Sequence, residues 1–584
     1  MEGSKLESCF LPYWEANEVQ CKDQLNDPRN WNMIPSLNSV ALHDVVDQQL
    51  VRFTGMIQDM QNPEMYLEQY EVQDSITKQT TVKMGKYRDI PACGPDEVFI
   101  DDSRSNVHRE RQVLCCISIP ALNPWVKQLL ATGTDRHTEV KPLQHENKRA
   151  YSDESASSNK ALSSSISPPG TSVKRVCCDK KHVPRNVRCD TELHLPLPES
   201  QAKTCLVKVY DSDPALALND MIEVVGFLSV DPRLCLISEE MEDEGAQFHN
   251  LPGSLVPRLH AVSVRKLKHN NPLLELNFCS SADEVLGLAR LVRQDLHLVL
   301  SQVLLGDHLA ANYFICHLIS SVFQRSELLA LGQLSLNISN VVCGHGYTEK
   351  LYTVLRQLVT KSHYQPLTIE NLNKCTFTPK KDYDANRLVS GILQLSTQTH
   401  LVLDETCLEP GQLDSNGVHN VAALGTLISQ QKVDYDFQFY KLEFKADVPV
   451  LVLSEGKSLL PNDVAVPLEP DSKCLETWNE IFEAVNHYLQ EPVLQRLRKY
   501  LTAVRLLEYC LPQDLEQVIQ DDFVRLRRET DTKTSASDLH LLLVLSRLVS
   551  LSQGEGTLSR ESWDLACSME KQRKQRINGR VHQP

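Results

Sequence analysis

A short apolar run that ends in two adjacent carboxylates is the stretch of this sequence best suited to chemistry. Leu401-Val402-Leu403 is followed directly by Asp404 and Glu405. This pattern is typical of a buried parallel strand that carries acidic groups at its carboxyl end. In ATPases a Walker B strand presents such an Asp to Mg²⁺ and the adjacent Glu to a water molecule.

A nucleotide site also needs a glycine-rich loop that ends in Lys and Ser/Thr and holds the phosphates. The nearest upstream candidate runs from Leu304 to Tyr313 and contains Gly306 and Asp307. Asn312 stands where the Lys would be, and Tyr313 stands where the Mg²⁺-binding hydroxyl would be. This segment therefore has no cation for the phosphates. We interpret the region as an ATPase-like module that has lost its chemistry, and we expect no catalytic residue, cofactor or metal.

A structural role is the alternative for the acidic pair. Without the Lys, Asp404 and Glu405 would cap the strand end and hydrogen-bond the N-terminus of a neighbouring helix. Cys343-Gly344-His345-Gly346 is expected to be a turn, since no third metal ligand is near it in sequence. Zinc binding by Cys177, Cys178, His182 and Cys189 is disfavoured because their spacing does not match known zinc fingers.

Composition excludes several classes of protein. The chain has 584 residues, of which 41% are hydrophobic and 23% charged, so it is too long for a single core. A formal net charge of −16 argues against wrapping nucleic acid by bulk electrostatics. The 18 cysteines are scattered, so we expect reduced thiols. We expect no secretory signal after Met1–Lys5 and no membrane span, because long apolar runs are absent.

Helical and strand-like runs alternate around the acidic pair. They predict a parallel sheet with helices on both faces, so Asp404, Glu405, Ser454 and Glu455 should meet at the carboxyl edge of the sheet. Helical spacing before Gly306 weakens the P-loop interpretation, because a true P-loop follows a strand. The helical runs are 283–304, 310–322, 347–359 and 478–569, and the strands are 334–338, 401–405 and 449–454.

The first half of the chain predicts small β structures. Strand-like runs at 50–60, 80–84 and 112–119 indicate a β-rich domain. Two more runs, 205–210 and 219–232, fit a small barrel of the OB type, with Gly226 where a strand bends. Such a barrel could take in strands from the earlier part of the chain.

A Ser-rich, basic segment separates these two β regions. It has few large apolar side chains, so residues 132–190 are expected to be a disordered linker. Its basic pairs are Lys148-Arg149, Lys174-Arg175 and Lys180-Lys181. They are consistent with either a solvated linker or a bipartite nuclear import signal.

These features together resemble the minichromosome maintenance (MCM) complex-binding protein family, whose members are relatives of the replicative helicase subunits. The resemblance covers nearly the whole chain outside the linker. The passages that carry it are Met56–Met60, Gly85–Asp89, Leu206–Tyr210, Phe227–Pro232, Ala385–Gly391, Gln431–Phe437 and Ser454–Pro461.

The same resemblance extends to the degenerate site. The helicase loop Leu-Leu-Gly-Asp-Pro-Gly-x-Ala-Lys-Ser is similar to the segment from Leu304 to Tyr313, and the Asp-Glu of its Walker B strand corresponds to Asp404 and Glu405. Ser454 stands where the helicase carries a sensor Asn. Each departure removes a charge or donor that phosphoryl transfer requires.

The expected fold is therefore a multidomain α+β protein. It has an N-terminal β-rich and OB-like region, then a degenerate AAA+-like α/β domain with a C-terminal helical lid. The expected divisions are a β-rich domain (1–131), a linker (132–190), an OB-like region (191–282), an AAA+-like domain (283–470), a lid (471–570) and a basic tail (571–584).

The resemblance implies a non-catalytic nuclear protein that binds MCM helicase subunits in place of one hexamer member. It implies roles in helicase assembly or unloading during DNA replication and in sister-chromatid cohesion. Chromatin would be reached through the helicase, with no membrane association and no direct sequence-specific nucleic-acid binding. The alternative is a nucleotide-dependent switch or an OB protein that binds single-stranded DNA.

Overall fold

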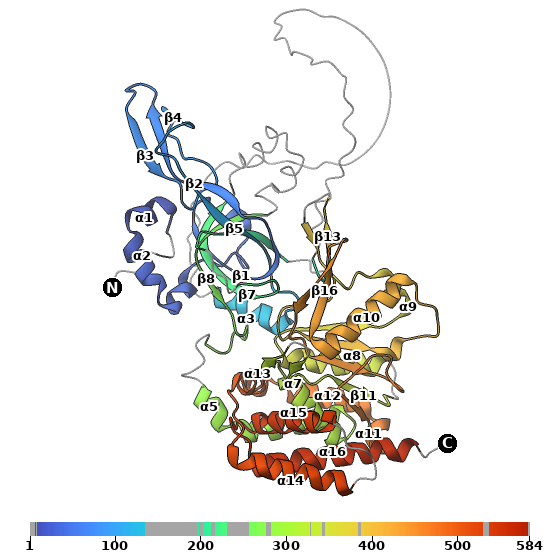
Figure 1. Ribbon diagram of the computed structural model, residues 1–584. Helices are drawn as coiled ribbons and strands as arrows, with labels where there is room; N and C mark the ends of the chain where they lie inside the picture. The colour runs from blue at the N-terminus through green and yellow to red at the C-terminus, as the bar shows by residue number, and fades with distance from the viewer. Residues whose placement is uncertain are drawn as a thin grey trace, which may run out of the picture. The chain divides into compact units, whose positions relative to one another are not determined.

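A computed structural model describes residues 6, 9–134, 195–197, 202–211, 216–230, 256–275, 282–326, 329–341, 345–383, 387–529 and 536–581. The protein is a mixed α and β structure, with a multi-strand sheet in its N-terminal part and helices in its C-terminal part (Figure 1). The three basic pairs of the expected linker and the four residues weighed for zinc lie outside the described residues.

Five strands of the N-terminal part close on themselves into a ring. Neighbouring strands pair antiparallel, except for one parallel pair, β6 with β8. The expected ranges 1–131 and 191–282 both contribute strands, so they form one structure instead of two domains. The strands are β1 (Leu50–Met60), β5 (Val107–Ile117), β6 (Thr204–Val209), β7 (Met221–Ser229) and β8 (Arg258–Lys266).

Alternating side chains fill the interior of this ring. Val51, Phe53 and Ile57 of β1 pack with Leu114 of β5 in one core. Gly226 lies where the pairing of β7 with β8 shifts its register. A Cβ atom at this glycine would lie 2.3 Å from the carbonyl oxygen of His260, so the backbones approach too closely for any side chain.

Further elements surround the ring. Trp14 is buried and makes an edge contact with Phe227, with ring centroids 5.6 Å apart, so the N-terminal helices dock on the barrel. The additional strands β2, β3 and β4 extend beyond the ring (Figure 1). These elements are α1 (Leu11–Ala16), α2 (Glu18–Leu25), η1 (Pro28–Met33), η2 (Leu42–Asp44), β2 (Glu64–Asp74), β3 (Thr80–Met84), β4 (Glu97–Phe99) and α3 (Pro124–Thr134).

The second half of the chain contains a five-stranded parallel sheet in the order β12-β15-β18-β11-β19. Successive residues of β15 face two cores, with Val402 on one side and Leu401 and Leu403 on the other. Helices therefore cover both faces, as the sequence predicts. The strands are β11 (Leu336–Ser339), β12 (Ser362–Pro366), β15 (His400–Asp404), β18 (Val450–Leu453) and β19 (Val464–Pro467).

The late helices share one core with this sheet. Leu548 and Ala566 pack in the same cluster as Leu336 and Val464, so the ranges expected as lid and α/β domain are joined. The helices are α5 (Ala282–Gly287), α6 (Ala289–Val303), α7 (His308–Ile319), α8 (His345–Leu358), α9 (Ile369–Lys374), η5 (Glu405–Cys407), α10 (Ser415–Gln430), α11 (Ser472–Glu476), α12 (Trp478–Tyr488), α13 (Glu491–Leu506), α14 (Gln513–Glu529), α15 (Ala536–Ser552) and α16 (Arg560–Val581).

The basic residues after 570 do not form a separate exposed tail. They continue α16, and Arg576 donates to the buried carboxylate of Asp307 at 2.6 Å and lies 3.1 Å from a carboxylate oxygen of Glu469. Pairing with acidic groups anchors this part of the helix, which composition alone does not reveal.

A smaller sheet has the order β14-β13-β16-β17. Buried hydrogen bonds join this region to the barrel: the Gln394 amide donates to the Gln58 carbonyl at 2.8 Å, and the Asn219 amide donates to the Tyr435 hydroxyl at 2.8 Å. The strands are β13 (Lys380–Asp382), β14 (Arg387–Val389), β16 (Lys432–Asp436) and β17 (Lys441–Lys445), and a two-stranded pair is formed by β9 (Gln324–Arg325) and β10 (Ala330–Leu331).

The close approach of the two backbones at Gly226 predicts that adding one methyl group there lowers the stability of the protein. Gly226→Ala should lower the free energy of unfolding by about 1–3 kcal/mol, because two backbones must separate to admit it. Gly456→Ala is the matched control, since no atom lies within 4 Å of its added Cβ. Urea unfolding followed by circular dichroism measures both. Equal midpoints for the two variants would contradict the tight packing of β7 against β8.

Candidate functional site

The carboxyl edge of the parallel sheet brings the predicted acidic and polar residues together. Asp404 ends β15, and Ser454 follows β18. The backbone N–H of Val341, just after β11, donates to the Ser454 carbonyl at 3.1 Å, and that of Asn340 donates to the Glu455 carbonyl at 3.1 Å. Neighbouring strands thus end at one place, as expected for a ligand site in an α/β sheet.

Asp404 is completely buried, and its carboxylate is fully used by the protein itself. One oxygen accepts from Thr348 Oγ1 at 2.7 Å, from the Tyr364 hydroxyl and from Cys407 Sγ at 3.5 Å. The other accepts from the backbone N–H and the hydroxyl of Thr406 at 2.9 and 2.6 Å. This carboxylate caps η5, so the structural role considered from the sequence is the role that the geometry gives it.

Glu405 is also held by neighbouring groups. Its two oxygens accept from Ser458 Oγ at 2.9 Å and from the Leu459 N–H at 3.2 Å. Burial raises the pKa of Glu405 above its usual value, although these hydrogen bonds act in the opposite direction. A carboxylate tied to the following loop is poorly placed to orient an attacking water molecule.

The helix α8 follows the parallel strand β11 along the chain, as the helix of a P-loop follows a strand. Gly346, Tyr347 and Thr348 lie in the first turn of α8 and align with the last three positions of the G-x-x-x-x-G-K-[ST] pattern. In P-loop enzymes the Ser/Thr of this pattern and the Walker B Asp hold Mg²⁺ together. Here Thr348 and Asp404 stand in those two places and bond directly to each other.

Tyr347 takes the position of the phosphate-binding Lys. Its side chain is 1% exposed, and its hydroxyl donates to the Val303 carbonyl at 2.7 Å. Its ring makes edge contacts with Trp478 and Phe482, at centroid distances of 5.9 and 5.7 Å. A buried aromatic group therefore fills the place of the cation, so this position cannot supply the charge that the phosphates of a nucleotide need.

The segment from Leu304 to Tyr313 is not this loop, which corrects the sequence-based interpretation. It joins α6 to α7, so no strand precedes it. Asp307, one residue after Gly306, caps α7 by accepting from the N–H groups of Leu309 and Ala310. Asn312 accepts from Arg293 at 2.8 Å, and the buried Tyr313 hydroxyl donates to Glu570 at 3.1 Å. These side chains stabilise helix packing.

The sequence contained a signal for this second candidate loop. The expected strand at 334–338 is followed within ten residues by Gly346 and Thr348 at the start of the expected helix. A search for the full motif passes over this segment because Tyr347 replaces the Lys. Residues 342–344 of the segment lie outside the described part of the chain.

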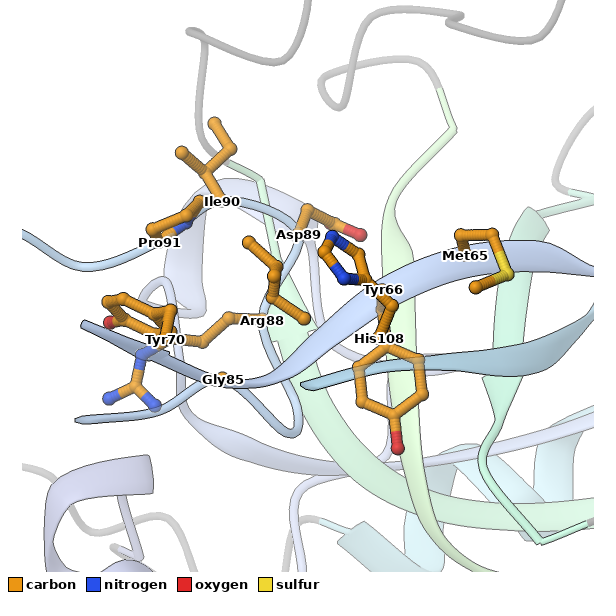
Figure 2. A pocket seen from close by; sticks show the side chains of 10 residues that line it. Met65, Tyr66, Tyr70, Gly85, Arg88, Asp89, Ile90, Pro91 and His108 are labelled. Carbon is orange, nitrogen blue, oxygen red and sulfur yellow. The ribbon is translucent and has the colours of Figure 1, made fainter. Parts of the chain in front are cut away.

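A cavity of about 230 Å³ opens between β2 and the loop after β3. Tyr70 and Met65 lie toward its opposite ends (Figure 2). Its buried acidic residue, Asp89, belongs to a charge network with Arg111 at 2.8 Å, Lys208 and His260 at 3.2 Å. The cavity is smaller than typical ligand pockets, and its charged lining residues serve the barrel.

Within the described ranges, no three His, Cys, Asp or Glu side chains gather closely enough to hold a metal ion. The helices of that part of the chain are too short or too polar to cross a membrane. The cysteines described there are free thiols.

Comparison with known proteins identifies similar sequences along almost the whole chain. The model of the family described as "Mini-chromosome maintenance replisome factor" matches residues 21–577. The chain is 41% identical to the Mini-chromosome maintenance complex-binding protein of Drosophila melanogaster over 579 residues, which cover 96% of this chain and 95% of the relative. It is 37% identical to the protein of that name from Homo sapiens over 623 residues, with 99% and 96% covered.

The hydrogen bonds of Asp404 predict that replacing one of its carboxylate oxygens by an amide nitrogen strongly lowers the stability of the protein. Asp404→Asn places an amide donor against the Thr348 and Tyr364 hydroxyls. Leaving buried donors without an acceptor should cost about 2–4 kcal/mol of unfolding free energy. Glu455→Gln, at an exposed carboxylate on the same edge, is the control and should change little. Guanidinium unfolding tests both. An Asn variant as stable as the native chain would mean that these bonds do not organise the edge.

The network around Asp89 predicts a pH dependence of stability. Burial alone would raise the pKa of this carboxyl, but His260, Lys208 and Arg111 outweigh it and hold the pKa well below its usual value. A depressed folded-state pKa stabilises the protein at neutral pH, and this contribution is lost as pH falls through the usual Asp range and below. Asp89→Asn should cost about 3–5 kcal/mol at pH 7, because it leaves buried cations underpaired.

The measurement is the difference in unfolding free energy between the native chain and Asp89→Asn at a series of pH values. We expect that difference to shrink as the pH falls below the usual Asp range. A difference that stays constant down to strongly acidic pH would show that Asp89 is not ionised through this network.

Proposed function

Because this chain belongs to the mini-chromosome maintenance replisome factor family, we propose that it binds subunits of the MCM complex and acts in DNA replication without catalysing a reaction. The observation that carries the non-catalytic part is the Thr348–Asp404 hydrogen bond beside the buried Tyr347. Tyr347 stands in place of the cation on which phosphoryl transfer depends, and the two residues in the metal-ligand positions bond to each other.

We also propose that the two sheets are a barrel of the OB type and a degenerate AAA+ sheet. A five-stranded closed ring whose strands do not pair in simple chain order supports the first assignment. The second is supported by an all-parallel sheet with its loop-helix segment after the inner strand β11 and its acidic pair at the end of β15. The helices α12–α16 would be the lid of that module.

A subunit-like fold without a working site suggests how binding occurs. The chain would stand in the place of one hexamer member and present an ATPase-like face to its neighbours. Such interfaces are large, and their binding energy is concentrated in a few buried anchors. We further propose that the protein is nuclear and reaches chromatin through the helicase. It would assist the assembly or unloading of helicase subunits and support sister-chromatid cohesion. These proposals rest on the family resemblance alone.

The alternative of a nucleotide-dependent switch has little physical support. A switch needs a ligand whose affinity differs between two states. Tyr347 fills the position of the phosphate-binding Lys. Both carboxylate oxygens of Asp404 already accept hydrogen bonds from groups of the protein.

Binding to MCM subunits is tested with purified full-length chain and purified MCM complex. The intact chain is required, because buried contacts such as Asn219 with Tyr435 join its two sheets. Native mass spectrometry should detect complexes that contain this chain and lack at least one helicase subunit, with or without ATP. Absence of any complex would refute the function. Attachment to a complete hexamer would refute the substitution of one member.

A further inference from the structure

The turn between β16 and β17 exposes large aromatic side chains. Phe439 is 85% exposed and Tyr440 is 52% exposed, and the exposed Tyr383 follows the neighbouring strand β13. A phenylalanine so open to water loses the benefit of burial, and clustered exposed apolar groups usually mark a binding surface. We call this group of rings, together with Phe437, the aromatic tip.

The tip is ordered by specific contacts. The rings of Tyr383 and Phe439 lie 5.8 Å apart, and those of Phe437 and Tyr440 stack at 5.3 Å with planes 3° apart. The Tyr383 hydroxyl donates to the Phe437 carbonyl at 3.1 Å, which ties the two chain segments together. The rings are therefore held in place before any ligand arrives, which reduces the entropy lost on binding.

Lysines lie beside these rings. Asp436 is the register partner of Lys380 on one side and of Lys441 on the other, and both lysines are exposed. The pKa of His419 is below its usual value, first because of partial burial and then because Lys441 and Lys380 are close. Lys and Arg outnumber Asp and Glu on the four described strands, in a chain whose net charge is −16.

We propose that the aromatic tip binds single-stranded nucleic acid, with bases stacked on Phe439 and Tyr440 and phosphates contacted by Lys380 and Lys441. Stacking on aromatic rings combined with positive charge is the way in which proteins hold single strands without reading their sequence. Addition of a partner's β-strand at β17 is less favoured, because charged residues alternate along this edge strand. This binding would be additional to the proposed MCM binding.

The test is fluorescence anisotropy of labelled oligo-dT, about 20 nucleotides long, with the full-length protein at low salt. The native chain should bind, and the Phe439→Ala/Tyr440→Ala double variant should bind at least about tenfold more weakly. Phe439→Trp/Tyr440→Trp should retain affinity because it keeps two ring faces. Ile76→Ala/Val98→Ala removes exposed aliphatic groups elsewhere and should not change binding.

Two further arms examine the phosphate contacts and the kind of strand. Lys380→Gln/Lys441→Gln should reduce the slope of log affinity against log salt by about 0.7 for each phosphate that the protein no longer neutralises. Oligo-U should bind similarly to oligo-dT if the rings and charges provide the affinity, and a strong preference for one of them would identify the natural strand as DNA or RNA.

Three results would overturn this inference. The first is that the native chain does not bind oligo-dT or oligo-U at low salt. The second is that the Ala double variant binds as tightly as the native chain, which would place any binding site elsewhere. The third is that the double variant no longer binds an MCM subunit while its oligonucleotide affinity is unchanged, which would make the tip a protein anchor. Because the changed side chains are exposed, thermal unfolding should be the same for all variants.

Discussion

A buried carboxylate must be neutralised or fully hydrogen-bonded, and the way Asp404 meets this requirement determines the structure around it. In a nucleotide enzyme a metal ion would share that task. Here hydroxyls, a thiol and a backbone N–H supply every contact described for the carboxylate. The donors come from the start of α8, from β12 and from η5, so one side chain connects three elements at the edge of the sheet.

The side chains that fill the carboxyl edge of the sheet also connect it to the late helices. Tyr347 and its contacts with Trp478 and Phe482 join the loop position to the late helices, so the sheet and those helices form one core. A ring-forming ATPase uses nucleotide binding to change the contacts between subunits. In this chain the buried Tyr347 and the Thr348–Asp404 hydrogen bond occupy the corresponding position.

Much of the fold follows from local patterns, and the errors have physical causes. The expected strands at 50–60 and 80–84 match β1 and β3. Asp404, which ends β15, and Ser454, which follows β18, lie at the carboxyl ends of neighbouring strands as predicted. The strand β12 was missed because Ser362-His363-Tyr364-Gln365-Pro366 has no apolar alternation. The Leu304–Tyr313 interpretation relied on sequence similarity, but helices precede and follow that loop. Three rings of the aromatic tip are close together in sequence, but Tyr383 comes from a distant segment, so only the structure shows that it belongs with them. Whether the chain binds MCM subunits remains a prediction.

The central claim is that protein side chains occupy the nucleotide position, and equilibrium dialysis with radiolabelled ATP and Mg²⁺ tests it most directly. The structure predicts no saturable binding by the purified full-length chain, because the cation is missing and Asp404 already has its partners. One equivalent of bound ATP that disappears in the Thr348→Ala variant would contradict the claim and would show that the site at the sheet edge is still in use.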